Sequence, residues 1–177
     1  MSKEIQNLVR SALAGDLDSF GELATRYYAA LVSIAYAICG DRHLAEDAAQ
    51  ESLARALVRL QTLQRPDRFG PWLCRICRNV AHDTLAHRAR QASNEDVSHV
   101  RQPVRADDDT SPVKEAVAAL SQPARELVVL RYYNDLSYEQ ISEVLGISKA
   151  AINGRLTRAK RKLAAYLKRH GYPETSK

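Results

Sequence analysis

Apolar residues recur every three or four positions from Leu17 to about Arg90, with short breaks at residues 39–41 and 65–67. This spacing is typical of amphipathic helices that bury one face. The breaks read Cys-Gly-Asp and Arg-Pro-Asp, which are residue types that end helices and cap the next one. The pattern therefore predicts a first domain built from helices, and no strand-like alternation is sustained anywhere in the chain.

The periodicity is lost over residues 93–111, where three successive acids occupy positions 107–109. Such a segment is too polar to bury a core, which predicts a flexible linker. Helical spacing resumes at Pro112, directly after a candidate N-cap at Ser111. We therefore expect an all-α protein of two small helical domains, 1–92 and 112–177, joined by the acidic linker 93–111.

The sharpest local signal lies in residues 137–156. Ser137 and Gln140 have the spacing of a capping box, and Gly146 stands where a helix would need a left-handed C-cap. Ser148 can cap a following helix whose apolar stripe includes Ile152 and Leu156. Cap, glycine turn and second cap at these intervals predict a helix-turn-helix.

The second helix of that motif is predicted to be basic on its outward face. A recognition helix in a DNA major groove needs an apolar face toward its own domain, small residues for close approach and cations for phosphates. The positions expected to face DNA are Lys149, Ala150, Asn153, Gly154, Arg155, Thr157, Arg158 and Arg161. A solvated basic surface helix is the plainer interpretation, and the motif by itself does not separate one class of DNA-binding protein from another.

Charge is distributed unevenly along the chain. The net charge is +5, but residues 146–177 carry nine Lys or Arg and one acid, whereas residues 91–112 carry five acids and two Arg. The C-terminal end is therefore suited to a polyanion and the linker is not. No apolar stretch is long enough to cross a bilayer, and the first residues lack the apolar core of a signal peptide, so we expect a cytoplasmic protein without membrane insertion.

Two polar stripes stand out in the first domain. Asp47, Gln50 and Glu51 share one face of a helix, where Glu51 can pair with Arg55. A later helix, from residue 72, turns apolar residues inward and presents a second stripe beside a loop rich in Pro and Gly, which could hold a DNA strand with an unstacked base. That stripe consists of Arg75, Arg78, Asn79 and His82. On periodicity alone, ordinary solvated surface is the favoured interpretation of the first stripe, and for the second stripe the two interpretations are evenly balanced.

Cys74 and Cys77 form a C-x-x-C, so metal binding and redox chemistry have to be considered. A structural zinc site needs four ligands, and the other candidates nearby in sequence are Cys39, His43 and His82. The pair lies within one predicted helix and lacks the strand-then-helix context of a thioredoxin-like site. We therefore expect neither a metal nor another cofactor, and interpret the cysteines as small, weakly polar residues without special chemistry.

At this point the order of motifs resembles the extracytoplasmic-function group of sigma-70 family sigma factors. The matching segments are FGEL at 20–23, YY at 27–28, DAAQE at 47–51, FGPWLCRICRN at 69–79, LSQPAREL at 120–127, LSYEQIS at 136–142 and RLTRAKRKL at 155–163. They extend over nearly the whole chain outside the linker and the ends. The departures are Asn153-Gly154, where relatives often have Arg or Lys followed by Ser, and the two cysteines at positions usually held by Tyr and Ala.

The resemblance implies a role for each part. The first domain would be sigma region 2, in which Asp47, Gln50 and Glu51 dock on the β′ clamp helices of core RNA polymerase. Trp72, Arg75, Arg78, Asn79 and His82 would capture the melted −10 strand, with Asn79 at a flipped base. The second domain would be sigma region 4, which reads the −35 duplex and meets the β flap. The implied partners are core polymerase, promoter DNA and an anti-sigma factor.

Two other functions compete with a sigma factor that has no catalytic activity of its own. A stand-alone helix-turn-helix regulator would bind duplex DNA without polymerase and would need neither stripe of the first domain. An enzyme or redox switch would depend on the C-x-x-C, but the sequence offers no Ser/His/Asp order, phosphate-cradling loop or paired catalytic carboxylates. Promoter recognition together with polymerase explains more of the sequence features than either of these two alternatives does.

Overall fold

The computed structural model describes residues 3–94 and 111–172, and its described residues form helices without any strand. The first domain contains α1 (Lys3–Leu13), α2 (Leu17–Cys39), α3 (Arg42–Arg59), η1 (Leu60–Thr62), η2 (Pro66–Arg68) and α4 (Phe69–Asn94). The second contains α5 (Pro112–Ala118), α6 (Gln122–Val128), η3 (Val129–Tyr133), α7 (Tyr138–Leu145) and α8 (Lys149–Arg169). The all-α prediction is confirmed, whereas the predicted linker falls almost wholly outside the described residues.

The break predicted at residues 39–41 is confirmed, together with its chemistry. Gly40 ends α2 in the left-handed conformation, with φ 68°, and its amide donates to the Tyr36 carbonyl. Asp41 then caps α3 by accepting a hydrogen bond from the Leu44 amide. Because a residue with a Cβ is strained at positive φ, glycine is the residue that closes this turn at least cost.

Helix α1 was not foreseen from the sequence. It buries Val9 and Ala12 completely or nearly so, and Ile5 and Leu8 are partly buried against the same core. These four residues have helical spacing, so the signal was present in the sequence, but the segment is short and polar on its other face. In the structure α1 packs against α2, and Arg26 of α2 pairs with Glu4.

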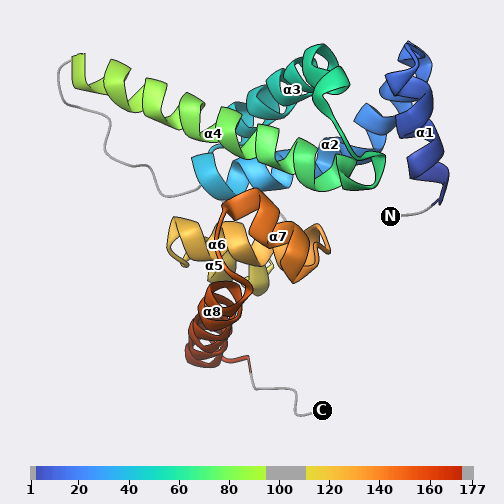
Figure 1. Cartoon of the computed structure of the whole chain (residues 1–177). Coiled ribbons are helices and arrows are strands. Elements are labelled where there is room, and N and C mark those ends of the chain that lie inside the picture. The colour runs from blue at the N-terminus through green and yellow to red at the C-terminus, as the bar shows by residue number, and fades with distance from the viewer. Residues whose placement is uncertain (1–2, 95–110, 173–177) are drawn as a thin grey trace.

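The core of the first domain lies where α2, α3 and α4 meet. Leu23, Leu31 and Ile34 of α2 pack with Phe69 and Leu73 of α4, and all five are at most 1% exposed. The side of α3 that faces them is lined mainly by alanines, which allow the helices to approach closely. This packing fixes the direction of α4, the longest of the described helices, which slopes from the upper left to the middle right of Figure 1.

The helix-turn-helix prediction is confirmed at each cap. Ser137 and Gln140 form the complete capping box, and Gly146 ends α7 with φ 67°. Ser148 accepts a hydrogen bond from the Ala151 amide at the start of α8. Upstream, α6 continues directly into the π-helical segment η3, a feature that the sequence pattern did not predict.

The two domains pack against each other. Helices α2 and α4 contact α6, η3 and α7 of the second domain, which lies below them in Figure 1 while α8 points away. Arg125 donates to the Ala37 carbonyl at 2.8 Å, and Asn134 donates to the Ser33 hydroxyl at 3.3 Å. The second domain is therefore held near the C-terminal end of α2.

No helix in the described ranges, 3–94 and 111–172, is both long enough and apolar enough to span a membrane.

Two glycines are expected to respond oppositely to alanine. Gly21 lies inside α2 with open space where alanine would place its Cβ, whereas Gly146 requires a positive φ. Gly21→Ala should stabilise the protein by about 0.5–1 kcal/mol, because alanine loses less backbone entropy in a helix. Gly146→Ala should destabilise it by about 1–2 kcal/mol. Urea unfolding of both variants checks this, and equal shifts would contradict the left-handed cap.

Candidate nucleic-acid and partner interfaces

Helix α8 has the two faces that the sequence predicts. Ile152, Leu156 and Ala159 are at most 1% exposed and pack into the second domain. The eight residues expected to face DNA all lie on α8, where seven are exposed and Gly154 is partly buried. Lys149 forms a salt bridge with Glu139 of α7, which lowers the pKa of that carboxyl group. The helix therefore presents an outward face that is largely polar and basic.

An aromatic and cationic cluster beside α8 was missed by the sequence analysis. The Arg131 guanidinium lies 5.9 Å from the ring centroids of both Tyr132 and Tyr138, and the Lys160 ammonium lies 5.5 Å from that of Tyr132. The Tyr138 hydroxyl is 3.5 Å from the side-chain oxygen of Asn153. In the sequence, the run Arg131-Tyr132-Tyr133 was the feature that could have predicted this cluster. Cation–π contacts hold these positive charges next to the basic face of α8.

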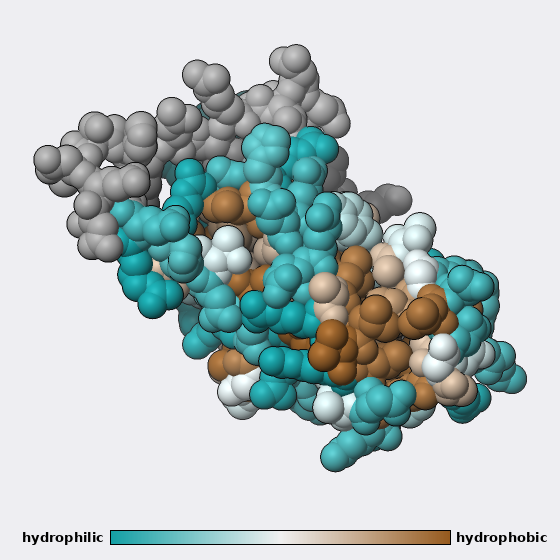
Figure 2. All heavy atoms as spheres, turned by 90° about the horizontal axis from the view of Figure 1, so that it is seen from above, coloured by the Kyte–Doolittle hydropathy of each residue, from teal (hydrophilic) through white to brown (hydrophobic). Residues whose placement is uncertain are grey.

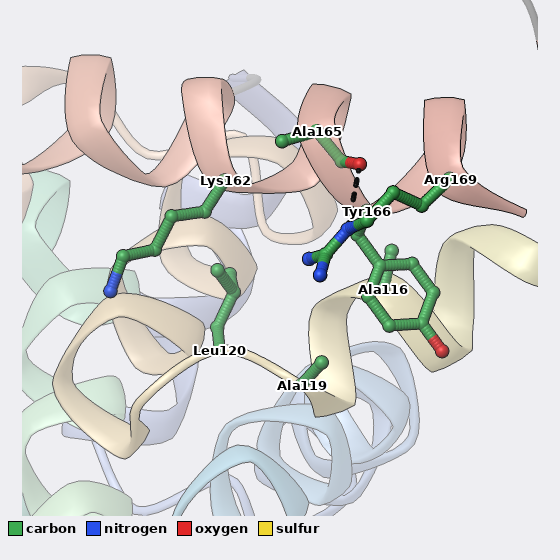
Figure 3. A pocket seen from close by; sticks show the side chains of 7 residues that line it. All are labelled: Ala116, Ala119, Leu120, Lys162, Ala165, Tyr166 and Arg169. Carbon is green, nitrogen blue, oxygen red and sulfur yellow. Dashed lines mark hydrogen bonds between the residues drawn. The ribbon is translucent and has the colours of Figure 1, made fainter.

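A shallow groove separates α5 from the C-terminal half of α8 (Figure 3). Its volume is about 260 Å³, and Ala116, Ala119 and Leu120 form its apolar side. Tyr166 lies along the other side, with its ring stacked on that of His170 at 4.1 Å between centroids. The groove is separate from the buried stripe of α8, so it leaves a second surface of this helix open to a partner.

The polar stripe of α4 divides into two parts. Trp72 is partly buried, with its ring 5.9 Å from that of Phe69, while Arg75 and Asn79 are exposed to solvent. Arg78 and His82 are partly buried and face the second domain. The structure thus brings the five candidate residues onto one helix but gives them different surroundings.

Glu126 of α6 is the group that Arg78 and His82 face. Its carboxylate accepts a hydrogen bond from Arg78 Nε at 2.5 Å, and its other oxygen lies 4.0 Å from His82 Nε2. Glu126 is 4% exposed, and a buried carboxylate requires a partner of opposite charge. Part of the candidate DNA surface is therefore engaged by the second domain.

Helix α3 turns its candidate docking residues outward. Asp47, Gln50 and Glu51 are exposed, and Glu51 pairs with Arg55 at 2.7 Å, as predicted. The same face continues over the next two turns through Leu57 and Val58, which are 42% and 84% exposed. The sequence analysis did not include Leu57 and Val58 in the docking face. They have the same helical spacing as the predicted residues, so this signal was present in the sequence.

Apolar side chains gather on the face of the molecule that carries α1, α3 and α4 (Figure 2). The large exposed apolar residues described in this domain are Leu17, Leu57 and Val58. Exposed aliphatic side chains beside acids are typical of protein–protein contact. The outward face of α3 is therefore a candidate docking surface whose first half is acidic and whose second half is apolar.

The three cysteines of the first domain are free thiols, and Cys39 is only partly buried. Cys74 and Cys77 are buried, and burial raises the pKa of each to about 12. Cys77 donates to the Leu31 carbonyl at 3.3 Å, and burial raises the pKa of Cys39 to about 11. Among the described residues no group of His, Cys, Asp or Glu is arranged to hold a metal ion. The thiols therefore lack the features of reactive cysteines.

Two family models match the chain, Sigma-70 region 2 over residues 23–91 and Sigma-70, region 4 over residues 111–163. The probable RNA polymerase sigma factor RfaY of Xanthomonas campestris is 35% identical over 162 residues. This alignment includes 84% of the present chain but only 40% of RfaY, so the chain spans less than half of that relative.

Two further proteins are similar over most of their lengths. The ECF RNA polymerase sigma factor BldN of Streptomyces coelicolor is 31% identical, with 94% of this chain and 67% of BldN aligned. The sigma factor RpoE of Bartonella quintana, solved in complex with the anti-sigma factor NepR, is 25% identical with a TM-score of 0.71. That structural match covers 84% of this chain and 96% of RpoE.

Thiol reactivity provides a direct test of the cysteine assignment. Because the pKa values of Cys74 and Cys77 are raised by burial, both should remain protonated and unreactive toward an aromatic disulfide reagent at about pH 8. All three thiols should react rapidly once the chain is unfolded in urea, since unfolded cysteine has a pKa of about 8.5. Rapid reaction of two thiols in the native protein would instead support a redox pair.

Proposed function

Since the chain belongs to the sigma-70 family, in its extracytoplasmic-function group, we propose that its two helical domains divide promoter recognition between them. Sigma factors of this family direct promoter-specific transcription initiation, and this chain is one of them. In the proposal, residues 1–92 dock on core polymerase and recognise the −10 element, and residues 112–177 recognise the −35 element. Residues 93–111 join the two.

The observation that carries the proposal is the outward face of α3 next to the cationic stripe of α4. A DNA-binding regulator that works alone would need neither an acidic and apolar docking face nor a surface for an unpaired strand. Asp47, Gln50 and Glu51 supply charges and polar groups for contact with the β′ clamp helices, and Leu57 and Val58 supply apolar area. We assign all five residues to polymerase docking.

The −10 strand is assigned to α4. Arg75 and Arg78 can pair with phosphates, and His82 extends the polar stripe. Trp72 adds a partly exposed aromatic side chain near the start of the helix. Asn79 is exposed and carries both a donor and an acceptor, so it can hydrogen-bond the edge of an unstacked base. In this assignment Arg75 and Arg78 contact the backbone of the strand, and Asn79 contacts one of its bases.

The −35 duplex is assigned to the outward face of α8. Asn153 and Gly154 lie near the start of the helix, where a recognition helix approaches base edges, and Asn can pair bidentately with adenine. Arg155, Arg158 and Arg161 supply phosphate contacts farther along. Lys149, Ala150 and Thr157 complete the surface. The Arg131–Tyr132–Tyr138 cluster adds cations beside it.

Further partners follow from the same proposal. The groove between α5 and α8 is the surface we assign to the β flap of polymerase. The likeness to RpoE, whose solved structure contains the anti-sigma factor NepR, adds an anti-sigma factor as a partner. Sigma factors are generally non-enzymatic initiation factors, and we propose that this chain likewise has no catalytic activity and acts in the cytoplasm, where bacterial RNA polymerase works.

Reconstituted transcription tests the proposed function. Purified protein is added to bacterial core polymerase with a library of promoter fragments, and the start sites are sequenced. Initiation that depends on core polymerase and on a shared two-part motif is expected. If core polymerase does not bind while the protein alone selects duplex DNA, the chain is a regulator and the assignment of the first domain is wrong.

Asn79→Ala separates strand capture from docking in that assay. Loss of the base contact should reduce open-complex formation by roughly 5- to 150-fold, because a hydrogen-bonded base contact contributes about 1–3 kcal/mol. Binding to core polymerase should be unchanged, which a fluorescence titration measures. Loss of core binding in this variant would refute the base-contacting role of Asn79.

Arg158→Ala probes the −35 surface. If Arg158 contacts a phosphate, the variant should bind −35 duplex more weakly for all sequences, and the slope of log K against log salt should fall in magnitude by about one. Gel-shift titrations of holoenzyme over a range of salt concentrations measure both quantities. An unchanged slope with relaxed sequence preference would instead place Arg158 at a base edge.

A further inference from the structure

Tyr138 of α7 reaches across the turn of the helix-turn-helix to Asn153 of α8. Its hydroxyl donates a hydrogen bond to the Asn153 side-chain oxygen at 3.5 Å. Asn153 is exposed and lies on the second turn of α8, in the part of a recognition helix that approaches base edges. An amide on the proposed DNA-binding face is therefore oriented by the neighbouring helix before DNA binds.

The Tyr138 ring is itself restrained. It is partly buried against the apolar core, and the Arg131 guanidinium lies 5.9 Å from its centroid. Arg131 is fixed in turn, because its Nη1 donates to the Leu136 carbonyl at 3.1 Å. Ser137, the residue before Tyr138, belongs to the capping box of α7. The hydroxyl that meets Asn153 is therefore carried by a ring with little freedom to move.

This contact divides the hydrogen-bonding capacity of Asn153. A side-chain amide has one acceptor oxygen and two N–H donors. The oxygen of Asn153 already accepts from Tyr138, whereas the NH2 group stays available to DNA. A bidentate contact with adenine needs the same oxygen to accept from adenine N6, so adenine has to compete with Tyr138 for it.

Gly154 allows a second group of donors to lie beside the first. The Arg158 Nη1 atom is 3.6 Å from the point where a side chain at position 154 would place its Cβ. The guanidinium thus lies over the bare backbone of Gly154, next to Asn153 in the chain. Because an arginine side chain has donors and no acceptor, it adds further N–H groups to this part of α8.

We propose that Asn153, held by Tyr138, recognises a guanine of the −35 duplex as a hydrogen-bond donor and discriminates against adenine. In the major groove guanine presents two acceptors, N7 and O6, whereas adenine combines one acceptor with a donor and cytosine presents a donor. Two N–H groups on one nitrogen match the guanine edge and meet an opposing N–H group on the other two bases.

This assignment rests on the proposed function, because it takes α8 as the helix that enters the −35 major groove. It goes beyond that function by naming the base and the residue that sets the choice. Asn153 is the residue that contacts the base, and Tyr138 is a positioning residue that acts through it.

Tyr138→Phe removes the hydroxyl and keeps the ring. Wild type and variant are each assembled with core polymerase and allowed to bind duplexes randomised over the −35 element, and the bound sequences are counted. The wild type should enrich guanine at one position whose preference disappears in Asn153→Ala. In Tyr138→Phe the freed oxygen can accept from adenine, so the ratio of guanine to adenine at that position should fall roughly five-fold or more.

Tyr133→Phe is the matched control. Tyr133 is 67% exposed and precedes the helix-turn-helix, so the same hydroxyl is removed outside the Tyr138–Asn153 pair. This variant should select the same sequences as the wild type. A loss of guanine in the control equal to that in Tyr138→Phe would contradict the specific role of Tyr138.

Asn153→Asp tests the donor role without altering Tyr138. Aspartate has nearly the same shape but only acceptor oxygens, so guanine should be rejected and cytosine, which presents a donor, should be enriched at the same position. Retention of guanine in Asn153→Asp would overturn the proposal.

The remaining outcomes separate this proposal from the proposed function. If Tyr138→Phe weakens binding to all sequences equally and leaves the base preference unchanged, its hydroxyl serves the DNA backbone and the proposal is wrong. A wild-type preference for adenine at the position that depends on Asn153 also overturns it. If the wild-type holoenzyme enriches no −35 sequence at all, the proposed function itself fails.

Discussion

Helix α2 is the element on which the rest of the structure depends, because it packs against both domains. Leu23, Leu31 and Ile34 face the other helices of the first domain, whereas Ser33 and Ala37 hold residues of the second. A helix that is buried over such a broad arc cannot turn without breaking both sets of contacts. It therefore fixes the position of α4 and also the surface on which the second domain rests.

The functional surfaces are the sides of helices that this packing leaves exposed. In α3 the alanine side is buried, which turns Asp47, Glu51 and Val58 outward. In α8 the burial of Ile152 and Leu156 turns the basic side outward in the same way. Each proposed partner thus meets a helix face whose orientation is set by apolar burial on the opposite side. Because the core is rigid, it holds the side chains of that face in fixed positions.

The interface between the domains contains a buried ion pair. Glu126 and Arg78 form a pair that requires both domains, so its free energy depends on their separation. A buried ion pair often contributes little net stability, since desolvation offsets much of the attraction, but it strongly disfavours arrangements in which one partner is left alone. Such a contact therefore makes the packing of the two domains specific rather than strongly stable.

The sequence by itself determined the local structure: the capping box at Ser137, the left-handed cap at Gly146 and the outward face of α8 all follow from interactions between residues a few positions apart. It also placed Asp47 and Glu51 on one face of a helix. Helix α1, the apolar extension at Val58 and the cluster around Arg131 left weaker signals that were missed. The pairing of Arg78 with Glu126 was decided only by the tertiary structure, because it joins residues 48 positions apart whose meeting depends on how two whole domains pack.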